Sequence, residues 1–228
     1  MGFGLILSHS FKPSMLVKPI LALLYFIYMK ELRLPRRTNA LVIVAHPDDE
    51  TIWLGGALKK FKGVNWTIFC LCRASDKDRA PKFKKVCAHF GAKAIMTDLE
   101  DEGRLSIQQS LTPIKKLIVK NIKHKKFDYL FTHGANGEYG HERHQAVHLA
   151  VKDLVAKKFL KADQTFFFNY KKTDLSPKAD SDFVLKLSAK DLAAKQGAMT
   201  NIYGFAKNGI DVKYCTKIEA LKKLNYDL

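Results

Sequence analysis

Two short segments of the sequence bring imidazole and carboxylate groups together at spacings that suit metal-assisted hydrolysis. One is His46-Pro47-Asp48-Asp49-Glu50, and the other runs from residue 132 to residue 144 and reads THGANGEYGHERH. A hydrolytic zinc site uses three protein ligands, drawn from neutral histidine nitrogens and carboxylate oxygens, and leaves a fourth position for water. Both segments contain enough of these groups to supply such a site.

The spacing within the two segments suggests separate chemical roles. His46 and Asp49, three residues apart in a loop, can close on one metal ion, and His144 can reach it from the second segment. Asp48 is then free to act as a general base on the attacking water, and His141 faces the same cavity as a general acid or an electrostatic partner. A lone loop histidine is usually only hydrogen-bonded, so the prediction depends on the convergence of these groups. Two histidines and one carboxylate suit iron as well as zinc.

The elements that must position these groups alternate between strands and helices. Apolar runs predict the strands, and longer periodic stretches between them predict the helices. This order gives parallel strands with right-handed crossovers, hence a three-layer α/β/α fold with a Rossmann-like, mostly parallel sheet. Ligands bind at the carboxyl ends of such strands, just after residues 45, 72, 97 and 132. The expected strands are residues 40–45, 64–72, 93–97, 127–132, 164–170 and 183–187, and the expected helices are residues 51–61, 80–90, 111–123, 144–157 and 188–203.

The two motifs resemble those of the LmbE-like, or PIG-L, family of zinc-dependent N-deacetylases. They are the Ala-His-Pro-Asp-Asp-Glu sequence of residues 45–50 and the Gly-His-x-x-His pattern of residues 140–144, and the resemblance covers residues 40–155. It implies an α/β fold and removal of the acetyl group from N-acetylglucosaminyl conjugates. It also implies that His46, Asp49 and His144 are the metal ligands, that Asp48 is the base and that His141 takes the acid position.

Further assignments follow from the same resemblance. Tyr139 matches a tyrosine that supports the oxyanion in some members, and its hydroxyl is a suitable donor, with aromatic packing as the alternative. Arg79, at the head of a predicted helix, matches an arginine that contacts sugar or phosphate. The family's second motif usually reads His-Pro-Asp-His, but Arg143 replaces the aspartate here and is expected to lower the pKa of His141. Either Glu138 or Glu142 could replace the missing aspartate.

The composition is that of a folded globular protein with an excess of basic residues. Lys and Arg number 39 against 22 Asp and Glu, for a formal net charge of +17. Such a surface attracts phosphates, whether in nucleic acid, in lipid headgroups or in a phosphate-linked sugar. Because the lysines are scattered and no nucleic-acid-binding motif accompanies them, nucleic acid is not an expected partner, whereas an anionic membrane surface stays open. The family resemblance implies an N-acetylated amino-sugar conjugate as the partner.

The sequence predicts an N-terminal hydrophobic and basic extension, residues 1–38, followed by a single domain, residues 39–228. The most apolar stretch, residues 15–29, contains Lys18 and Pro19. Its uninterrupted apolar part is shorter than the roughly 20 residues that span a bilayer. Two alternatives remain open for it, a helix that packs on the domain and a monotopic membrane anchor.

The cysteines indicate a reducing compartment. There are 4 of them, too few and too irregular for a disulfide framework. The alternation of Cys70-Leu71-Cys72 predicts that both thiols lie on one strand face. We therefore expect a cytoplasmic protein, with attachment to the cytoplasmic face of a membrane left open.

The sequence favours a metal-dependent deacetylase of amino sugars over three alternatives. A zinc amidase acting on a larger conjugate would use the same ligands and differ only in substrate. A metal-holding scaffold without turnover has the Arg143 replacement as its one indication. A basic nucleic-acid-binding module would be exposed by salt-dependent binding to generic DNA.

Overall fold

The computed structural model describes residues 29–122 and 126–225. Their core is an 8-stranded sheet in the order β1-β7-β8-β6-β5-β2-β3-β4. Only β8 runs antiparallel to its neighbours β6 and β7, and the other pairings are parallel. The strands are β1 (Lys30–Glu31), β2 (Asn39–Val44), β3 (Asn65–Cys72), β4 (Lys93–Leu99), β5 (Lys126–Thr132), β6 (Lys161–Phe168), β7 (Phe183–Lys186) and β8 (Ile218–Lys223).

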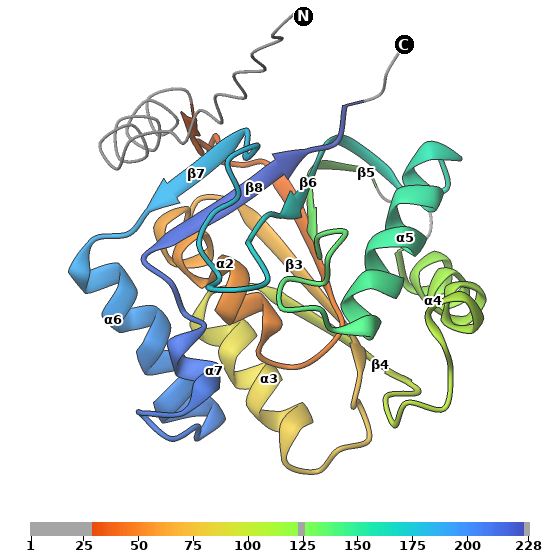
Figure 1. Cartoon of the computed structure of the whole chain (residues 1–228), viewed down its shortest axis with the longest axis horizontal. Coiled ribbons are helices and arrows are strands. Elements are labelled where there is room, and N and C mark those ends of the chain that lie inside the picture. Colours follow the sequence, from red (N-terminus) through yellow and green to blue (C-terminus); the bar gives the residue numbers. More distant parts are fainter. Residues whose placement is uncertain (1–28, 123–125, 226–228) are drawn as a thin grey trace, which may run out of the picture.

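Helices cover both faces of this sheet, which confirms the predicted three-layer α/β/α class (Figure 1). One apolar core lies under α2 (Asp49–Lys60), α3 (Arg79–His89), α6 (Ala189–Ala198) and the π-helix η1 (Met199–Tyr203), and the short helix α7 (Ile210–Lys213) also packs there. The other core lies under α4 (Ile107–Ile122) and α5 (Glu142–Ala156). The central strand β2 is buried from Ala40 to Val44 because it packs against helices on both sides.

The C-terminal third differs from the sequence prediction in its details. The expected helix 188–203 is divided, because α6 gives way to the wider turn of η1, which ends at Gly204 in the left-handed region (φ 81°). Neither α7 nor β8 was anticipated. The strand β8 fills the gap between β6 and β7 and reverses the local strand direction.

The N-terminal side of the domain begins earlier than the expected residue 39. β1 pairs with β7, and the side chains of Leu32 and Leu34 are buried in the core. Residues 1–28, which include nearly all of the apolar stretch, lie outside the described residues, so both interpretations of that stretch stay predictions. Within the described ranges, no helix is both long and apolar enough to cross a bilayer.

The end of β3 corrects one prediction about the cysteines. The register between β3 and β4 shifts between Cys70 and Cys72. Cys70 therefore packs in the core under α2 and α3, whereas Cys72 packs in the core under α4 and α5. All four cysteines are free and buried, but these two thiols do not share a strand face.

Candidate metal centre

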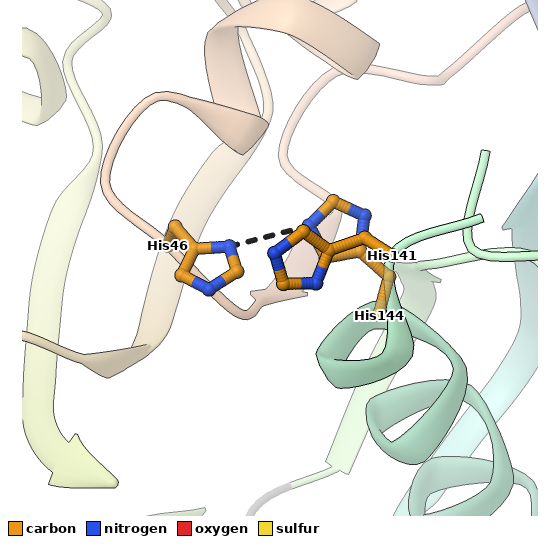
Figure 2. A group of neighbouring side chains, drawn as sticks. All are labelled: His46, His141 and His144. Atoms are coloured by element: carbon orange, nitrogen blue, oxygen red, sulfur yellow. Dashed lines mark hydrogen bonds between the residues drawn. The ribbon is translucent and has the colours of Figure 1, made fainter. Parts of the chain in front are cut away.

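The predicted metal ligands converge at the carboxyl ends of β2 and β5. His46 lies in the turn between β2 and α2, Asp49 is the first residue of α2, and His144 lies in the first turn of α5. His46 Nδ1 is 3.2 Å from His144 Nε2 and 3.3 Å from Asp49 Oδ2, and His144 Nε2 is 3.4 Å from Asp49 Oδ1. Figure 2 shows the His46 ring facing those of His141 and His144.

These separations fit a bound transition metal. A tetrahedral zinc site with bonds of about 2.0–2.1 Å places its ligand atoms about 3.3 Å apart. Imidazole nitrogens and a carboxylate oxygen are also the donors that zinc and ferrous iron both accept. The donor set therefore fits the metal that the two sequence motifs imply.

A separate carboxylate fixes the ring of each histidine. His46 Nε2 lies 2.7 Å from Asp101 Oδ1, and His144 Nδ1 lies 2.6 Å from Glu138 Oε2. When these nitrogens donate their protons to the carboxylates, His46 Nδ1 and His144 Nε2 are left with lone pairs that point at each other. Pairing of a ligating histidine with a carboxylate is the usual way in which proteins set the tautomer at a metal site.

A fourth histidine, His133, supports the site from below. It is fully buried and stacks on His144 with ring centroids 3.8 Å apart. Its Nε2 accepts the backbone N–H of Ala45 at 3.0 Å, and its Nδ1 donates to Glu138 Oε2 at 2.9 Å. His133 also lies close enough to Asp49 and His144 to hold a metal with them, but the hydrogen bonds of both its ring nitrogens favour a supporting role.

Glu138 connects these histidines. Its second oxygen, Oε1, accepts the backbone N–H of Gly134 at 2.7 Å. Burial would raise the pKa of Glu138, but the charge and hydrogen bonds of His133 and His144 hold it at about 2. The loop that carries Glu138 depends on Gly137, which has φ 61° and where a Cβ would collide with the carbonyl oxygen of His141.

Asp48 occupies a strained position beside the ligands. Its φ of 115° is rare for a residue with a side chain, and such strain is concentrated at functional sites. The buried Glu50 holds the turn, because Oε2 accepts the Asp48 N–H at 3.1 Å and Oε1 accepts the Tyr203 hydroxyl at 2.9 Å. The Asp48 carboxylate in turn accepts a hydrogen bond from Arg79 Nη1 at 3.2 Å.

The two adjacent aspartates differ in proton affinity. Burial, and then the negative charges of Asp49 and Glu50, raise the pKa of Asp48 well above its ordinary value. Burial acts on Asp49 in the same direction, but His144 and His133, when protonated, outweigh it by Coulombic attraction and hydrogen bonds and hold the pKa of Asp49 well below its usual range. Asp48 is thus the carboxylate of the pair that accepts a proton more readily.

His141 is a neutral side chain in this setting. Burial, followed by the charges of His144 and His46, lowers its pKa to about 4. Its Nδ1 accepts the backbone N–H of Arg143 at 3.2 Å, so the ring proton is on Nε2. The guanidinium of Arg143 turns away from this ring to Glu100 Oε2, at 3.0 Å, and to the Ser110 hydroxyl. The two candidates for the missing family aspartate do not replace it, because Glu138 pairs with His144 and His133, and Glu142 is exposed.

A cavity of about 240 Å³ opens over these groups. Tyr139 lines it and stacks on Tyr214, with ring centroids 5.2 Å apart. Burial raises the pKa of Tyr139, so its hydroxyl keeps its proton. A second cavity of about 490 Å³ shares Arg73, Asp101 and His141 with the first and extends toward the start of α4. The seven predicted site residues, His46, Asp48, Asp49, Arg79, Tyr139, His141 and His144, are thus at one site, all but His144 as lining of the smaller cavity.

Sequence reasoning missed several members of this site. Arg73 and Asp101 follow the ends of β3 and β4, where the strand-end rule directs attention, and they form an ion pair with 2.9 Å between Arg73 Nη2 and Asp101 Oδ2. His133 directly follows β5 and had the same signal. Tyr203, Asp211 and Tyr214 had no signal, because only the packing of the C-terminal helices brings Tyr203 to Glu50 and brings Asp211 and Tyr214 to the cavity.

Comparison with known proteins identifies relatives in sequence and in fold. One curated relative is "Uncharacterized protein L374" of Acanthamoeba polyphaga mimivirus. It is 23% identical over 134 residues, which are 52% of this chain and 58% of the viral protein. The chain therefore matches little more than half the length of that relative.

Three solved structures share the fold. The N,N'-diacetylchitobiose deacetylase from Pyrococcus horikoshii superposes with a TM-score of 0.62 at 14% identity, covering 93% of this chain and 94% of the deacetylase. GalB, the 4-carboxy-2-hydroxymuconate hydratase from Pseudomonas putida, gives 0.58 at 15% identity, covering 84% and 98%. The A40926 pseudoaglycone deacetylase Dbv21 gives 0.57 at 15% identity, covering 74% and 82%.

The sequence match to a family is more specific than these similarities in fold. Residues 41–155, half of the chain, match the family described as PIG-L, GlcNAc-PI de-N-acetylase. That span contains both histidine motifs and all seven of the predicted site residues. The chain belongs to the PIG-L family.

Proposed function

We propose that this protein is a metal-dependent hydrolase, most simply a zinc enzyme, that removes the acetyl group from an N-acetylated amino sugar. The observation that carries the proposal is the cluster of His46, Asp49 and His144, in which the two histidine nitrogens are 3.2 Å apart and each lies 3.3–3.4 Å from an Asp49 oxygen, Oδ2 for His46 and Oδ1 for His144. The non-ligating carboxylate of Asp48 lines the same cavity. Membership of the PIG-L family and the two deacetylases of the same fold support it.

A metal held by this triad would supply Lewis acidity, which polarises an amide carbonyl and makes water acidic enough to attack it at neutral pH. Asp48 lies beside the triad and takes the proton of the attacking water. Its raised pKa suits this role, because a base works best when its pKa approaches the operating pH. Asp48 can then return the proton to the amine nitrogen that leaves.

Neighbouring groups position the reacting amide. His141, protonated on Nε2, and Tyr139, with its phenolic proton, both donate hydrogen bonds into the cavity where negative charge develops on the carbonyl oxygen. Arg79 holds the Asp48 carboxylate and also lines the cavity. The arginine therefore has two uses, orientation of the base and contact with the substrate.

The cavity suits an amino-sugar conjugate. The ring of Tyr139 offers an apolar surface for the face of a pyranose, and Asp211 and Asp101 line the same cavity with acceptors for hydroxyl groups. The adjoining 490 Å³ cavity leaves room for the group to which the sugar is linked. That room also fits the alternative of a larger amide conjugate, so the substrate panel must include both.

The test is acetate release from a panel of N-acetylhexosamine conjugates and larger N-acyl conjugates, with metal content measured on the same protein samples. Asp49→Asn weakens a charged ligand and should lower both metal occupancy and turnover. Asp48→Asn should keep its metal and lose turnover by roughly a hundred- to ten-thousandfold, the usual contribution of a general base.

Each outcome has a consequence for the proposal. Near-normal turnover in Asp48→Asn would remove the base assignment. Absence of acetate release from every conjugate by the metal-replete protein would favour the scaffold alternative. The ion recovered from protein purified without added metal decides between zinc and iron.

A further inference from the structure

The two edges of the sheet at which its parallel strands end and begin differ in charge. Acidic side chains predominate in the connections at the carboxyl ends of the strands, where the metal centre lies, namely Asp48, Asp49, Glu50, Asp76, Asp78, Asp98, Glu100, Asp101, Glu102, Glu138 and Glu142. At the opposite edge, where helices end and parallel strands begin, basic residues outnumber the acidic residues Glu31, Asp128, Asp153, Asp163 and Asp182. The basic residues are Arg36, Arg37, Lys59, Lys60, Lys62, Lys93, Lys120, Lys126, Lys157, Lys158 and Lys161. We call this second edge the basic edge.

Helix stability accounts for only part of the basic edge. Lysines in the last turn of a helix, such as Lys59 and Lys60 in α2, complement the helix dipole. Lys93, Lys126 and Lys161 are instead the first residues of β4, β5 and β6. They have no helix dipole to complement. Lys126 forms an ion pair with Asp163, with 2.9 Å between Nζ and Oδ1, whereas Lys93 and Lys161 have no acidic partner among the described residues, so these two lysines point to an external anionic partner.

The basic edge is hollowed as well as charged. A hollow of about 630 Å³ is lined by Lys62, Lys93 and Lys126. A neighbouring hollow of about 430 Å³ is lined by Lys126, Lys158 and Lys161, by apolar side chains from the end of α5 and the start of β6, and by the Asp163 carboxylate that pairs with Lys126. Anionic headgroups could lie against both.

Phe159 indicates that the partner also has an apolar part. Its side chain is 67% exposed, in the connection Lys157-Lys158-Phe159-Leu160-Lys161 between α5 and β6. An aromatic ring surrounded by lysines is typical of a segment that lies in the interface of an anionic bilayer, where the ring enters the headgroup region and the ammonium groups meet phosphates.

The N-terminal stretch joins the domain at the same edge. β1 follows directly after Met29, and Glu31 in β1 forms an ion pair with Lys60 at the end of α2, with 3.1 Å between Oε1 and Nζ. Met29, the last residue of the apolar stretch 15–29, therefore lies beside the basic edge.

We propose that the basic edge docks on an anionic phospholipid surface, with Phe159 at the contact, and that the metal centre consequently opens away from that surface into the aqueous phase. This proposal does not depend on the deacetylase function. It restricts the substrate, because a sugar linked to a lipid of the docked bilayer would lie at the wrong edge of the sheet.

Vesicle binding by the full chain tests the contact. Phosphatidylcholine vesicles with and without phosphatidylserine separate the charge-dependent binding from binding by the apolar stretch alone. The triple variant Lys62→Glu, Lys93→Glu and Lys161→Glu should bind anionic vesicles at least about 100-fold more weakly, since each lysine near such a surface contributes about fivefold. The matched control, Lys84→Glu, Lys190→Glu and Lys207→Glu, makes the same change of net charge with exposed lysines outside the basic edge and should lose less than about tenfold.

Two further variants guard against misfolding and against a different partner. The triple variant Lys62→Arg, Lys93→Arg and Lys161→Arg should bind anionic vesicles as the unmodified protein does. Phe159→Ser should weaken vesicle binding without changing the affinity for DNA. Tighter binding to generic double-stranded DNA than to anionic vesicles, with no effect of Phe159→Ser on either, would overturn the proposal in favour of nucleic acid.

A lysine-acetylation footprint on vesicle-bound protein tests the orientation even if the apolar stretch dominates the affinity. Lys93, Lys126 and Lys161 should be protected, while Lys77 and Lys207 should react as in the free protein. Equal reactivity at the two edges, or protection at Lys77 and Lys207 instead, would refute the proposed orientation.

Discussion

The two segments that build the metal centre differ in how they are held. The turn between β2 and α2 supplies His46, Asp48 and Asp49 in only four residues, with a strained backbone at Asp48 and a partly exposed carboxylate, Asp101, behind His46. The loop between β5 and α5 is longer and supplies His144 from a helix, with the fully buried Glu138 behind it.

The turn between β2 and α2 therefore supplies the reactive carboxylates, whereas the loop between β5 and α5 supports them. The short turn presents two carboxylates to the cavity, one for the metal and one for the proton, at the cost of backbone strain. The longer loop, with His133 and Glu138 satisfied by several hydrogen bonds, provides a rigid wall against which the turn is set. We expect substitutions in the two segments to fail in different ways.

The largest expected effect is loss of the metal on removal of the ligand supplied by the loop. His144→Ala should lose most of a bound content of about one divalent ion per chain, because two ligands remain. Metal analysis of the purified protein measures this. His148→Gln is the control, since His148 lies one turn later in α5 and contacts only the backbone carbonyl of His133 among the cluster residues. Unchanged metal in His144→Ala would mean that the third ligand is misassigned.

Glu138→Gln should weaken both the site and the fold. One amide hydrogen would then face a histidine N–H, which leaves a buried donor unpaired and costs about 1–3 kcal/mol in the free energy of unfolding. Metal affinity should fall by about 10- to 100-fold through the loss of orientation of His144. Denaturant unfolding and metal titration give the two quantities. A fully stable variant would refute the supporting role of the loop.

Asp101→Asn makes the matched change at the carboxylate behind the other segment, which contacts His46 from the connection after β4. Metal affinity should again fall by about tenfold or more, because Asp101 orients His46. The free energy of unfolding should change by less than about 1 kcal/mol, since the Asp101 side chain is 14% exposed and water can satisfy the groups that it leaves. If this variant loses as much stability as Glu138→Gln, the contrast between the two segments fails.

The smallest expected effect concerns the strain at Asp48. With φ at 115°, glycine fits the position better than alanine, so Asp48→Gly should be more stable than Asp48→Ala by about 1 kcal/mol. Both variants lose the base, and neither should release acetate at the unmodified rate. Equal stabilities in thermal unfolding would show that the turn relaxes when the carboxylate is removed.

The sequence by itself determined the central architecture and the two motifs. Continuous apolar runs of strand length, such as residues 40–45, predict strands buried on both faces, and their alternation with helices predicts a parallel sheet whose carboxyl ends gather His46, Asp49 and His144. These features depend on local patterns and on one general rule of chain topology, so they can be read without knowledge of packing.

Only the tertiary structure decided how the ligands are oriented and what surrounds them. Asp101 stands in no local pattern with His46, because their contact spans 55 residues and is made across strand ends. Glu138 lies only six residues before His144, yet the sequence did not indicate which histidine it would orient. Likewise, the position of Arg143 in the motif predicted that its charge would lower the pKa of His141. In the structure its guanidinium instead contacts Glu100 and Ser110. The direction of a side chain depends on which partners it can reach. Many of these partners are distant in sequence and come within reach only in the folded chain.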